Sequence, residues 1–254
     1  MGTSILKVLF KDPEIDIVGT TETAGHHLLG CDLGVIVNST GTNITVTQDM
    51  GSAFKDAEVV IDFTTPASTL LTAAHCSTSN KAMVVGTTGF SREERKKLEQ
   101  MGEKVPIVIS PNMSIGVNLA FEVSKLLATR LGDEFDVEIV ETHHKDKVDA
   151  PSGTAIALAK SVAQGLGVDP DTHVRFERRG NIGKRKKGEI GVQTLRGGDV
   201  VGDHTVMFLG RGERLEITHR ALSRENFSRG VLRAAKWIAG KKPGIYSMKD
   251  VLGI

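Results

Sequence analysis

Residues 59–89, VVIDFTTPASTLLTAAHCSTSNKAMVVGTTG, decide the fold class of this chain. Two short runs rich in Val, Ile and Met, Val59–Phe63 and Met83–Gly86, flank a helical pattern over Ala67–Ser77. Both runs are bounded by Gly, Pro, Ser or Thr, as buried strands are. Strand–helix–strand alternation of this kind predicts parallel strands joined by a crossover helix.

The same pattern continues on both sides of this stretch. Ile15–Gly19 and Ile107–Ile109 read as further buried strands, and Glu93–Met101 reads as a helix. Together they predict a Rossmann-like, doubly wound parallel sheet of the α/β class. Ligands of such sheets bind at the carboxyl ends of the strands. Three segments are therefore expected around one crevice: Asp62–Thr65, Gly86–Gly89 and Ser110–Met113.

The first residues predict an incomplete dinucleotide fold. A helix capped by Thr3 or Ser4 is expected, and the next strand ends near Glu22, twenty residues after Gly2. That is the spacing at which a dinucleotide fold places its ribose-binding acid after the glycine loop. Met1 and Gly2 are thus interpreted as the end of a phosphate loop whose preceding strand is missing. Since that strand is central, an unpaired gap in the sheet is expected.

The pattern changes after about residue 114. A helix over about Val117–Leu131 leads into longer alternating segments, which predict a second α+β domain with a mixed or antiparallel open sheet. These segments are expected to be antiparallel strands, at 135–141, 189–195, 203–208 and 214–219. A last helix, about Glu225–Gly240, carries an apolar stripe. The predicted dinucleotide-binding domain comprises 1–114 and 224–254, and the predicted substrate-binding and oligomerisation domain comprises 115–223.

Residues 141–154, ETHHKDKVDAPSGT, carry the most chemistry. They lie between a predicted strand end and a helix that opens at Ser152-Gly153-Thr154. A helix N-terminus suits a bound carboxylate, and His143, His144 and Lys147 add cationic donors and a proton source. Paired histidines beside lysines are also typical of a plain solvated loop. The helix start favours a shared anionic target, hence a site for a carboxylate-bearing small molecule.

A metal site is not expected here. His143 and His144 are adjacent, so on a strand they point to opposite faces. Neither an HExxH pattern nor a cysteine pair accompanies them, because Cys31 and Cys76 are the only cysteines. His204 and His219, on predicted strands of the second domain, are interpreted as packed or interface residues.

Composition argues against several classes of partner. The 254 residues have a net charge of +1, no apolar run of membrane-spanning length and no signal-peptide pattern. A cytoplasmic protein without membrane partners is therefore expected. The basic stretch Arg178–Lys187 is typical of nucleic-acid or localisation segments. A mobile, solvated loop near the substrate is the favoured interpretation, with no nucleic-acid partner.

Five motifs in order give the chain a resemblance to a known family. Residues 143–154 match H-H-x-x-K-x-D-x-P-S-G-T, and the others are VGTTGF (85–90), NMSIGVN (112–118), RGGDVVGDHT (196–205) and ERLEITH (213–219). Over essentially its whole length, the chain resembles the 4-hydroxy-tetrahydrodipicolinate reductase family, also called dihydrodipicolinate reductase. That family acts in bacterial lysine and diaminopimelate biosynthesis.

The resemblance implies hydride transfer from NADH or NADPH to a cyclic imine dicarboxylate. It implies that His143 donates the proton, that Lys147 is a second catalytic donor, and that the substrate carboxylates are held by His144, Ser152, Gly153 and Thr154. It also implies a homotetramer built through the second domain's sheet. The cofactor would contact Met1, Gly2, Glu22, Thr23, Phe63, Gly86, Thr87, Thr88, Ser110, Pro111, Asn112 and Met113.

Two departures from the family pattern leave alternatives open. The family's glycine loop, G-x-x-G-R-M-G, remains only as Met1-Gly2, for which a shortened start is favoured over natural loss. Thr23 follows Glu22 where some members carry an arginine that meets a 2′-phosphate, which favours NADH weakly. One alternative is a non-catalytic dicarboxylate-binding oligomer that no longer binds the dinucleotide. Another is a different substrate, as in aspartate or homoserine dehydrogenases, and the motif at 143–154 argues against it.

Overall fold

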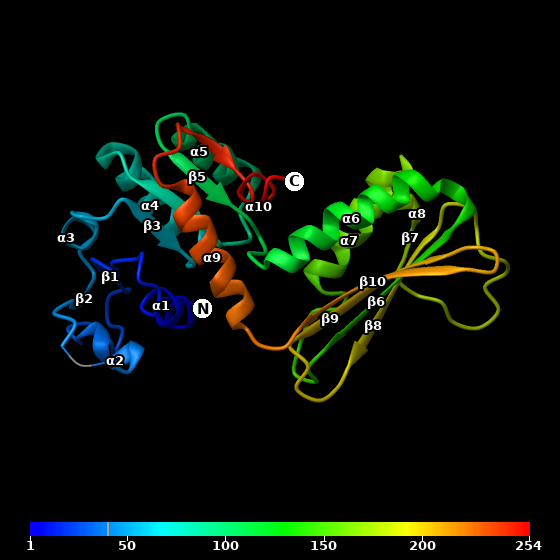
Figure 1. Ribbon diagram of the computed structural model, residues 1–254, viewed down its shortest axis with the longest axis horizontal. Helices are drawn as coiled ribbons and strands as arrows, with labels where there is room; N and C mark the ends of the chain where they lie inside the picture. Colours follow the sequence, from blue (N-terminus) through cyan, green and yellow to red (C-terminus); the bar gives the residue numbers. More distant parts are fainter. Residues whose placement is uncertain (40) are drawn as a thin grey trace. The chain divides into compact units, whose positions relative to one another are not determined.

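The computed structural model describes residues 1–39 and 41–254, which divide into two compact units. The first comprises residues 1–114 and 225–253, and the second comprises residues 115–224 and residue 254 (Figure 1). Arg224 falls in the second unit, one residue beyond the boundary expected from the sequence. Within the described residues, no helix combines the length and the apolar character needed to cross a membrane.

The first unit is built on a four-stranded parallel sheet with the strand order β11-β5-β4-β3. Its strands are β3 (Val59–Asp62), β4 (Ala82–Val85), β5 (Pro106–Ile109) and β11 (Gly244–Tyr246). Every residue of β4 and β5 is buried, which explains their continuous apolar sequences. The Rossmann-like fold class is therefore confirmed.

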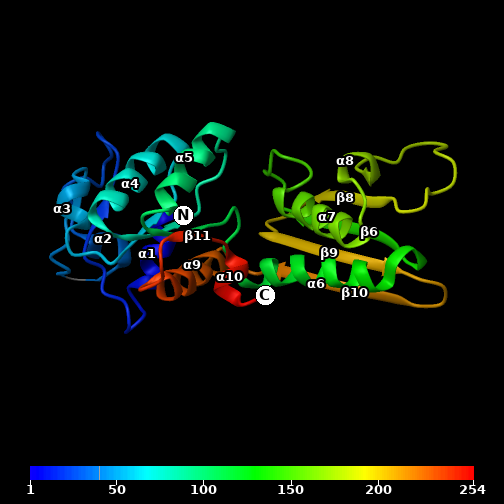
Figure 2. The same cartoon turned by 90° about the horizontal axis from the view of Figure 1, so that it is seen from above.

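Helices cover both faces of this sheet. Figure 2 shows α4 (Pro66–Ser79) and α5 (Arg92–Gly102) on one face, with α1 (Gly2–Leu9) and α9 (Glu225–Ile238) on the other. The caps are legible in the sequence: the Thr65 side chain caps α4, and Ser91 and Glu94 form a capping box on α5. Shorter helices complete the unit: α2 (Leu33–Val37), α3 (Met50–Phe54) and α10 (Met248–Leu252).

The segment before β3 departs from expectation. The strand predicted at Ile15–Gly19 is wrong, since only Thr20–Thr21 form a strand, β1, which pairs in parallel with β2 (Val46–Thr47). This pair is a sheet of its own, and among the described residues β3 pairs only with β4. A strand needs a hydrogen-bonded neighbour, and residues 15–19 pair with no strand of the part of the chain that the structure describes.

The capping expected at the first helix is also wrong. Helix α1 begins at Gly2 with Met1 as its N-cap and no side-chain cap hydrogen bond, so Thr3 and Ser4 lie inside the helix. The Ser4 hydroxyl instead lies 2.9 Å from the Ser228 hydroxyl of α9. Ile5 and Leu9, on the same helical face, are buried, so packing on α9 positions the helix.

The second unit is a five-stranded sheet with the order β10-β9-β6-β8-β7. It contains β6 (Asp136–His143), β7 (Val174–Arg175), β8 (Ile190–Arg196), β9 (Gly202–Leu209) and β10 (Arg214–Ala221). β6 pairs with β8 in parallel and with β9 in antiparallel fashion, so the sheet is mixed. The expectation of antiparallel strands throughout is wrong at β8. Helix α7 (Gly153–Leu166) lies in the connection from β6, and a crossover of that kind produces parallel neighbours.

One face of this sheet packs on α7 and on the long helix α6 (Ile115–Leu131), as Figures 1 and 2 show. Burial alternates strictly along β6 and β9, so every second side chain joins the core. The inward residues of the strands include Val137, Ile139, Ile190, Val192, Val206 and Phe208. Short helices, η1 (Gly132–Glu134) and α8 (Pro170–His173), complete the unit.

The basic stretch 178–187 is not wholly solvated. Arg178 makes a bidentate ion pair with Glu138, at 2.7 and 2.8 Å, and two further hydrogen bonds to Glu189, at 2.6 and 3.2 Å. Arg185 also pairs with Glu138. Because these carboxylates are mostly buried, two arginines of the stretch serve to attach the loop to β6 and to the residue preceding β8. The interpretation as a solvated loop is therefore wrong for Arg178 and Arg185.

Candidate active site

The site in the second unit begins at the inward face of β6. Strand alternation places Glu141 and His143 on the same face as the core residues Val137 and Ile139. Glu141 is completely buried, and His143 is 9% exposed. A charged residue in such a position requires partners, and the structure supplies them.

Four residues donate hydrogen bonds to the Glu141 carboxylate. Oε2 lies 2.6 Å from His143 Nδ1 and 2.8 Å from Arg196 Nη1. Oε1 accepts from the Ser152 N–H at 3.0 Å, from Arg196 Nη2 at 3.0 Å and from the Thr194 hydroxyl at 3.1 Å. Burial opposes ionisation, but the hydrogen bonds from Arg196 and His143 outweigh it and lower the pKa of Glu141 to about 2. The carboxylate is therefore charged at neutral pH.

Arg196, at the end of β8, also fixes the loop after β6. Its Nη2 donates to the Asp149 carbonyl at 2.7 Å. The Gly197 N–H donates to the His143 carbonyl at 3.0 Å, and the Lys145 N–H donates to the Gly198 carbonyl at 3.2 Å. The loop that carries His144 and Lys147 is thus held against the loop that follows β8.

Ser152 caps the helix that faces this loop. Its hydroxyl accepts from the Ala155 N–H at 3.2 Å and lies 3.0 Å from His204 Nε2, and the residue is 2% exposed. Ser152 therefore uses its hydroxyl inside the protein. At Gly153, the first residue of α7, an added Cβ would meet nothing within 4 Å, so the helix start faces open space. An anion has room there beside the positive end of the helix dipole.

The cationic side chains lie on the exposed side of the same loop. Lys147 Nζ lies 2.7 Å from Asp149 Oδ1, and the lysine side chain is 20% exposed. His144 lines an open cavity of about 670 Å³, whose other lining residues are Lys145, Asp146, Gly198, Asp199, Val201 and Arg224. One loop thus brings together His143, His144, Lys147 and the start of α7.

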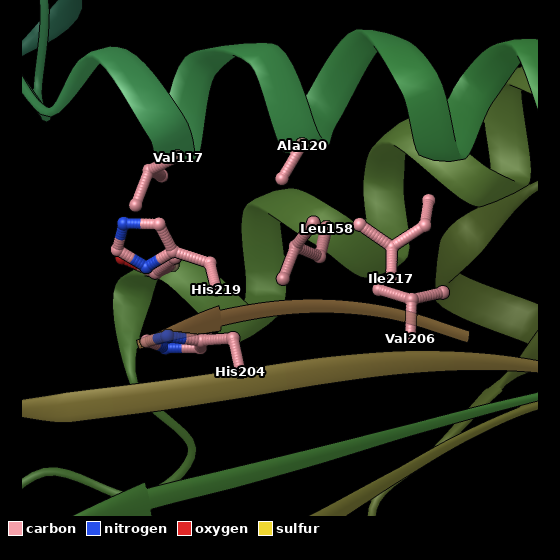
Figure 3. A pocket seen from close by; sticks show the side chains of 8 residues that line it. Val117, Ala120, Leu158, His204, Val206, Ile217 and His219 are labelled. Atoms are coloured by element: carbon pink, nitrogen blue, oxygen red, sulfur yellow. The ribbon is translucent and has the colours of Figure 1, made fainter. Parts of the chain in front are cut away.

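A second histidine, His204 on β9, packs behind His143. The two rings form an edge-to-face contact with centroids 5.1 Å apart. His204 and His219 line a cavity of about 10 Å³, the size of one water molecule, between the sheet and α6 (Figure 3). Burial, followed by the neighbouring His143, lowers the pKa of His204 to about 4. His204 is therefore neutral at pH 7.

In the first unit, a buried carboxylate connects the loops after β3 and β4. Asp62 Oδ1 accepts from the Thr64 N–H at 3.1 Å and from the hydroxyls of Thr64, Thr69 and Thr87 at 2.7, 2.9 and 3.1 Å. The Thr64 N–H also donates to the Thr87 hydroxyl at 3.0 Å. These bonds bring the segments 62–65 and 86–89 together, as the parallel sheet predicts.

The other predicted cofactor residues line the same carboxyl edge. A Cβ at Gly86 would lie 2.0 Å from the Phe63 ring, so only glycine permits this packing. After β5, the Ser110 hydroxyl donates to the Asn112 carbonyl at 2.7 Å, which shapes the turn through Pro111 to the buried Met113.

The remaining predicted cofactor residues lie near the start of the chain. Glu22 follows β1, and its carboxylate accepts from the Thr23 N–H at 3.3 Å. Gly2 opens α1, whose N-terminus has no side-chain cap and has open space at Gly2. A partly exposed acid and an open helix start fit a ribose and a phosphate, so the residues present fit a dinucleotide.

Glu141 and Arg196 were not predicted as site residues, and Asp62 was expected only as part of the crevice segment Asp62–Thr65. Glu141 carried a signal in the sequence, because it stands at an inward position of a strand whose other inward residues are apolar. Asp62 likewise ends a buried strand. Within the described residues, no group of His, Cys, Asp or Glu side chains has the arrangement of a metal site.

Comparisons with known proteins agree on one family. Residues 1–113 match the family model described as dihydrodipicolinate reductase, N-terminus, and residues 116–252 match the one described as dihydrodipicolinate reductase, C-terminus. The chain is 46% identical over 254 residues to a 4-hydroxy-tetrahydrodipicolinate reductase of Geotalea daltonii, covering 100% of this chain and 95% of that protein. Identity is 47% to the protein of that name in Anaeromyxobacter dehalogenans strain 2CP-C, covering 100% and 94%.

A solved structure shows the same fold. The dipicolinate-bound dihydrodipicolinate reductase of Paenisporosarcina sp. TG-14 aligns with a TM-score of 0.77 and 23% identity, covering 97% of this chain and 92% of that one. The likeness at this identity extends to the fold, including the parallel sheet of the first unit and the mixed sheet of the second.

Proposed function

The chain belongs to the dihydrodipicolinate reductase family, and we propose on this premise that it reduces 4-hydroxy-tetrahydrodipicolinate to tetrahydrodipicolinate with NADH or NADPH. The observation that carries the proposal is the loop 143–154, which carries an imidazole and a lysine and leads into the open start of α7. The product serves lysine and diaminopimelate biosynthesis, and the cytosol is the proposed location.

The second unit supplies the substrate site. The start of α7 at Gly153 and Thr154 offers backbone N–H groups to one carboxylate, and His144 contributes a further donor. Ser152 supports this site through its cap and its backbone position, because its hydroxyl is already engaged with His204. Lys147, next to Asp149, is the proposed second donor.

His143 is the proposed general acid. When bound, the reduced nicotinamide supplies a hydride to the ring of the substrate. The imidazolium of His143 provides the proton that balances this charge, and an imidazole can carry such a proton near neutral pH. Holding the anionic substrate by its carboxylates fixes the ring against the acid.

The first unit supplies the cofactor residues. Gly86, Thr87 and Thr88, with the segment Ser110–Met113 and Phe63, are the proposed nicotinamide contacts. Glu22 is proposed to accept from ribose hydroxyls, and its neighbour Thr23 lacks the positive charge that a 2′-phosphate favours, which supports a weak preference for NADH. Met1 and Gly2 are proposed near the pyrophosphate.

A homotetramer is proposed through the face of the second unit's sheet opposite α6 and α7. That face carries Thr205, Met207 and Leu209 of β9, all half-buried in the single chain. Native mass spectrometry checks this, and a single-chain mass of 27.3 kDa would contradict it.

The decisive experiment follows oxidation of NADH and NADPH at 340 nm, with the unstable substrate generated from pyruvate and aspartate semialdehyde by its synthase. Turnover that depends on the synthase is expected, and His143→Gln should lower kcat by about 10²–10⁴-fold, the contribution of a general acid. NADH fluorescence reports cofactor binding and so distinguishes the reductase from the non-catalytic alternative. Either NADH binding without turnover or the absence of NADH binding would contradict the reductase.

A further inference from the structure

We infer that Glu141 is the positioning residue of the proton-donor site, holding His143 so that Nε2 alone delivers the proton. The inference rests on the proposed reductase function and deepens it, because it names the donating atom and the group that aligns it. The Glu141 carboxylate is enclosed by protein groups and acts on the substrate only through His143.

The geometry at the first ring nitrogen carries the inference. Glu141 Oε2 and His143 Nδ1 are 2.6 Å apart, the short distance of a charge-assisted hydrogen bond. An ionised carboxylate can only accept, so the hydrogen is on Nδ1 in both the charged and the neutral ring. The remaining nitrogen, Nε2, gains or loses the exchangeable proton.

The Glu141 carboxylate is held in place independently of the His143 ring. Arg196 donates hydrogen bonds to both of its oxygens, and the Ser152 N–H and the Thr194 hydroxyl donate to Oε1. These partners come from the helix cap and from β8, so two other parts of the unit fix the carboxylate that β6 carries. Hydrogen bonds to the residue that supports a reactive group keep that group in the position that proton transfer requires.

The opposite side of the ring is shaped for access. Gly202 on β9 lies beside Nε2, and a Cβ there would come within 3.0 Å of that nitrogen. The edge of the His204 ring packs against His143 and limits its rotation. Nε2 thus lies on the side where the neighbouring strand contributes no side chain.

The step balances in atoms and charge. The 4-hydroxyl group leaves the substrate ring as water, which creates the double bond that is reduced. The N–H bond at Nε2 of the imidazolium then breaks and its proton bonds to the ring, while the hydride brings the electron pair. The neutral imidazole that remains keeps its hydrogen on Nδ1, held by Glu141. Proton uptake from water at Nε2 restores the imidazolium beside its carboxylate.

The test compares Glu141→Gln with Glu138→Gln in the full chain. Glu138 is a matched control: it lies on the same strand, is mostly buried and pairs with two arginines, but it faces the other side of the sheet. Because that side is the proposed subunit interface, native mass spectrometry first checks that both variants assemble like the wild type. Three readouts are taken: kcat with generated substrate, the Kd of dipicolinate, and the protonated nitrogen of His143 from ¹⁵N NMR. Dipicolinate is the ligand of the related Paenisporosarcina structure.

Glu141→Gln is expected to lower kcat by about 10²–10⁴-fold, since an amide can donate to Nδ1 and shift the ring hydrogen to Nε2 in the neutral form. The Kd of dipicolinate should change less than threefold, and Glu138→Gln should leave all three readouts near wild type. A neutral His143 with its hydrogen still on Nδ1, and a kcat within threefold, would overturn the inference.

The outcomes also separate this inference from the function. An inactive wild type would remove the reductase proposal, whereas the NMR comparison would still test positioning. An active wild type with an equally active Glu141→Gln would remove only the positioning role. If the amide variant does not fold, Glu141→Asp replaces it: lower kcat with unchanged dipicolinate affinity supports the inference, and unchanged kcat overturns it.

Discussion

At the scale of single residues, Asp62 is the buried carboxylate that orders the proposed nicotinamide loops. One oxygen accepts four hydrogen bonds from three threonines. Asp62→Asn keeps the shape and removes the charge, so these bonds weaken and the Gly86–Thr88 loop loosens. We expect the KM for NADH to rise about three- to tenfold, which corresponds to a loss of about 1 kcal/mol of binding energy.

The control for this change is Asp56→Asn, on the exposed turn before β3. It should leave the KM for NADH unchanged, and neither variant should alter the Kd of dipicolinate. Steady-state kinetics and dipicolinate titration check both expectations. Equal KM values for Asp62→Asn and wild type would mean that the threonine hydroxyls hold the loop without the charge.

At the scale of elements, the local sequence pattern predicted those helices and strands that local interactions determine. The strands over 59–62, 82–85 and 106–109 and the helices between them were expected, because apolar runs and caps are legible in the sequence. The strand predicted at 15–19 was wrong because strand formation depends on a neighbour elsewhere in the chain. The antiparallel direction predicted for β8 was wrong for a similar reason, since the crossover through α7 sets that direction.

The candidate site divides in the same way. The loop 143–154 is contiguous, so its chemistry was readable, whereas Arg196 reaches Glu141 across 55 residues of chain. Likewise, the net charge of the 178–187 stretch was visible, but its pairing with Glu138 was not. The contacts that the sequence did not predict are therefore those between residues far apart in the chain, whatever their residue types.

The attachment of this basic loop gives an element-scale prediction. Arg178→Gln removes four hydrogen bonds to Glu138 and Glu189, so we expect loss of about 1.5–3 kcal/mol from the local opening free energy of residues 176–189. Amide hydrogen exchange in this segment should quicken correspondingly. The exposed neighbour supplies the control, Arg179→Gln, which should exchange like wild type. Equal protection in both variants would show that the ion pairs do not hold the loop.

At the scale of the whole molecule, buried titratable groups set the response to acid. His204 has a folded pKa of about 4, below its usual 6.5, so the folded state holds it neutral. The unfolded chain binds a proton there first, and stability therefore falls as pH drops from about 6.5 towards 4. Glu141, with a pKa of about 2, adds stability above about 4.5 that is lost as pH falls through that value towards 2.

The two contributions can be separated because they occupy different pH windows. His204→Gln retains a polar side chain opposite Ser152 but cannot take up the proton, so its stability should change less than that of wild type between pH 7 and pH 5. The difference should approach about 1.4 kcal/mol for each pH unit below 6.5. Thermal unfolding of both proteins across this range measures it. Parallel curves above pH 4.5 would mean that His204 does not govern acid sensitivity, and that the neighbouring carboxylate of Glu141, which favours the protonated ring, compensates for its burial.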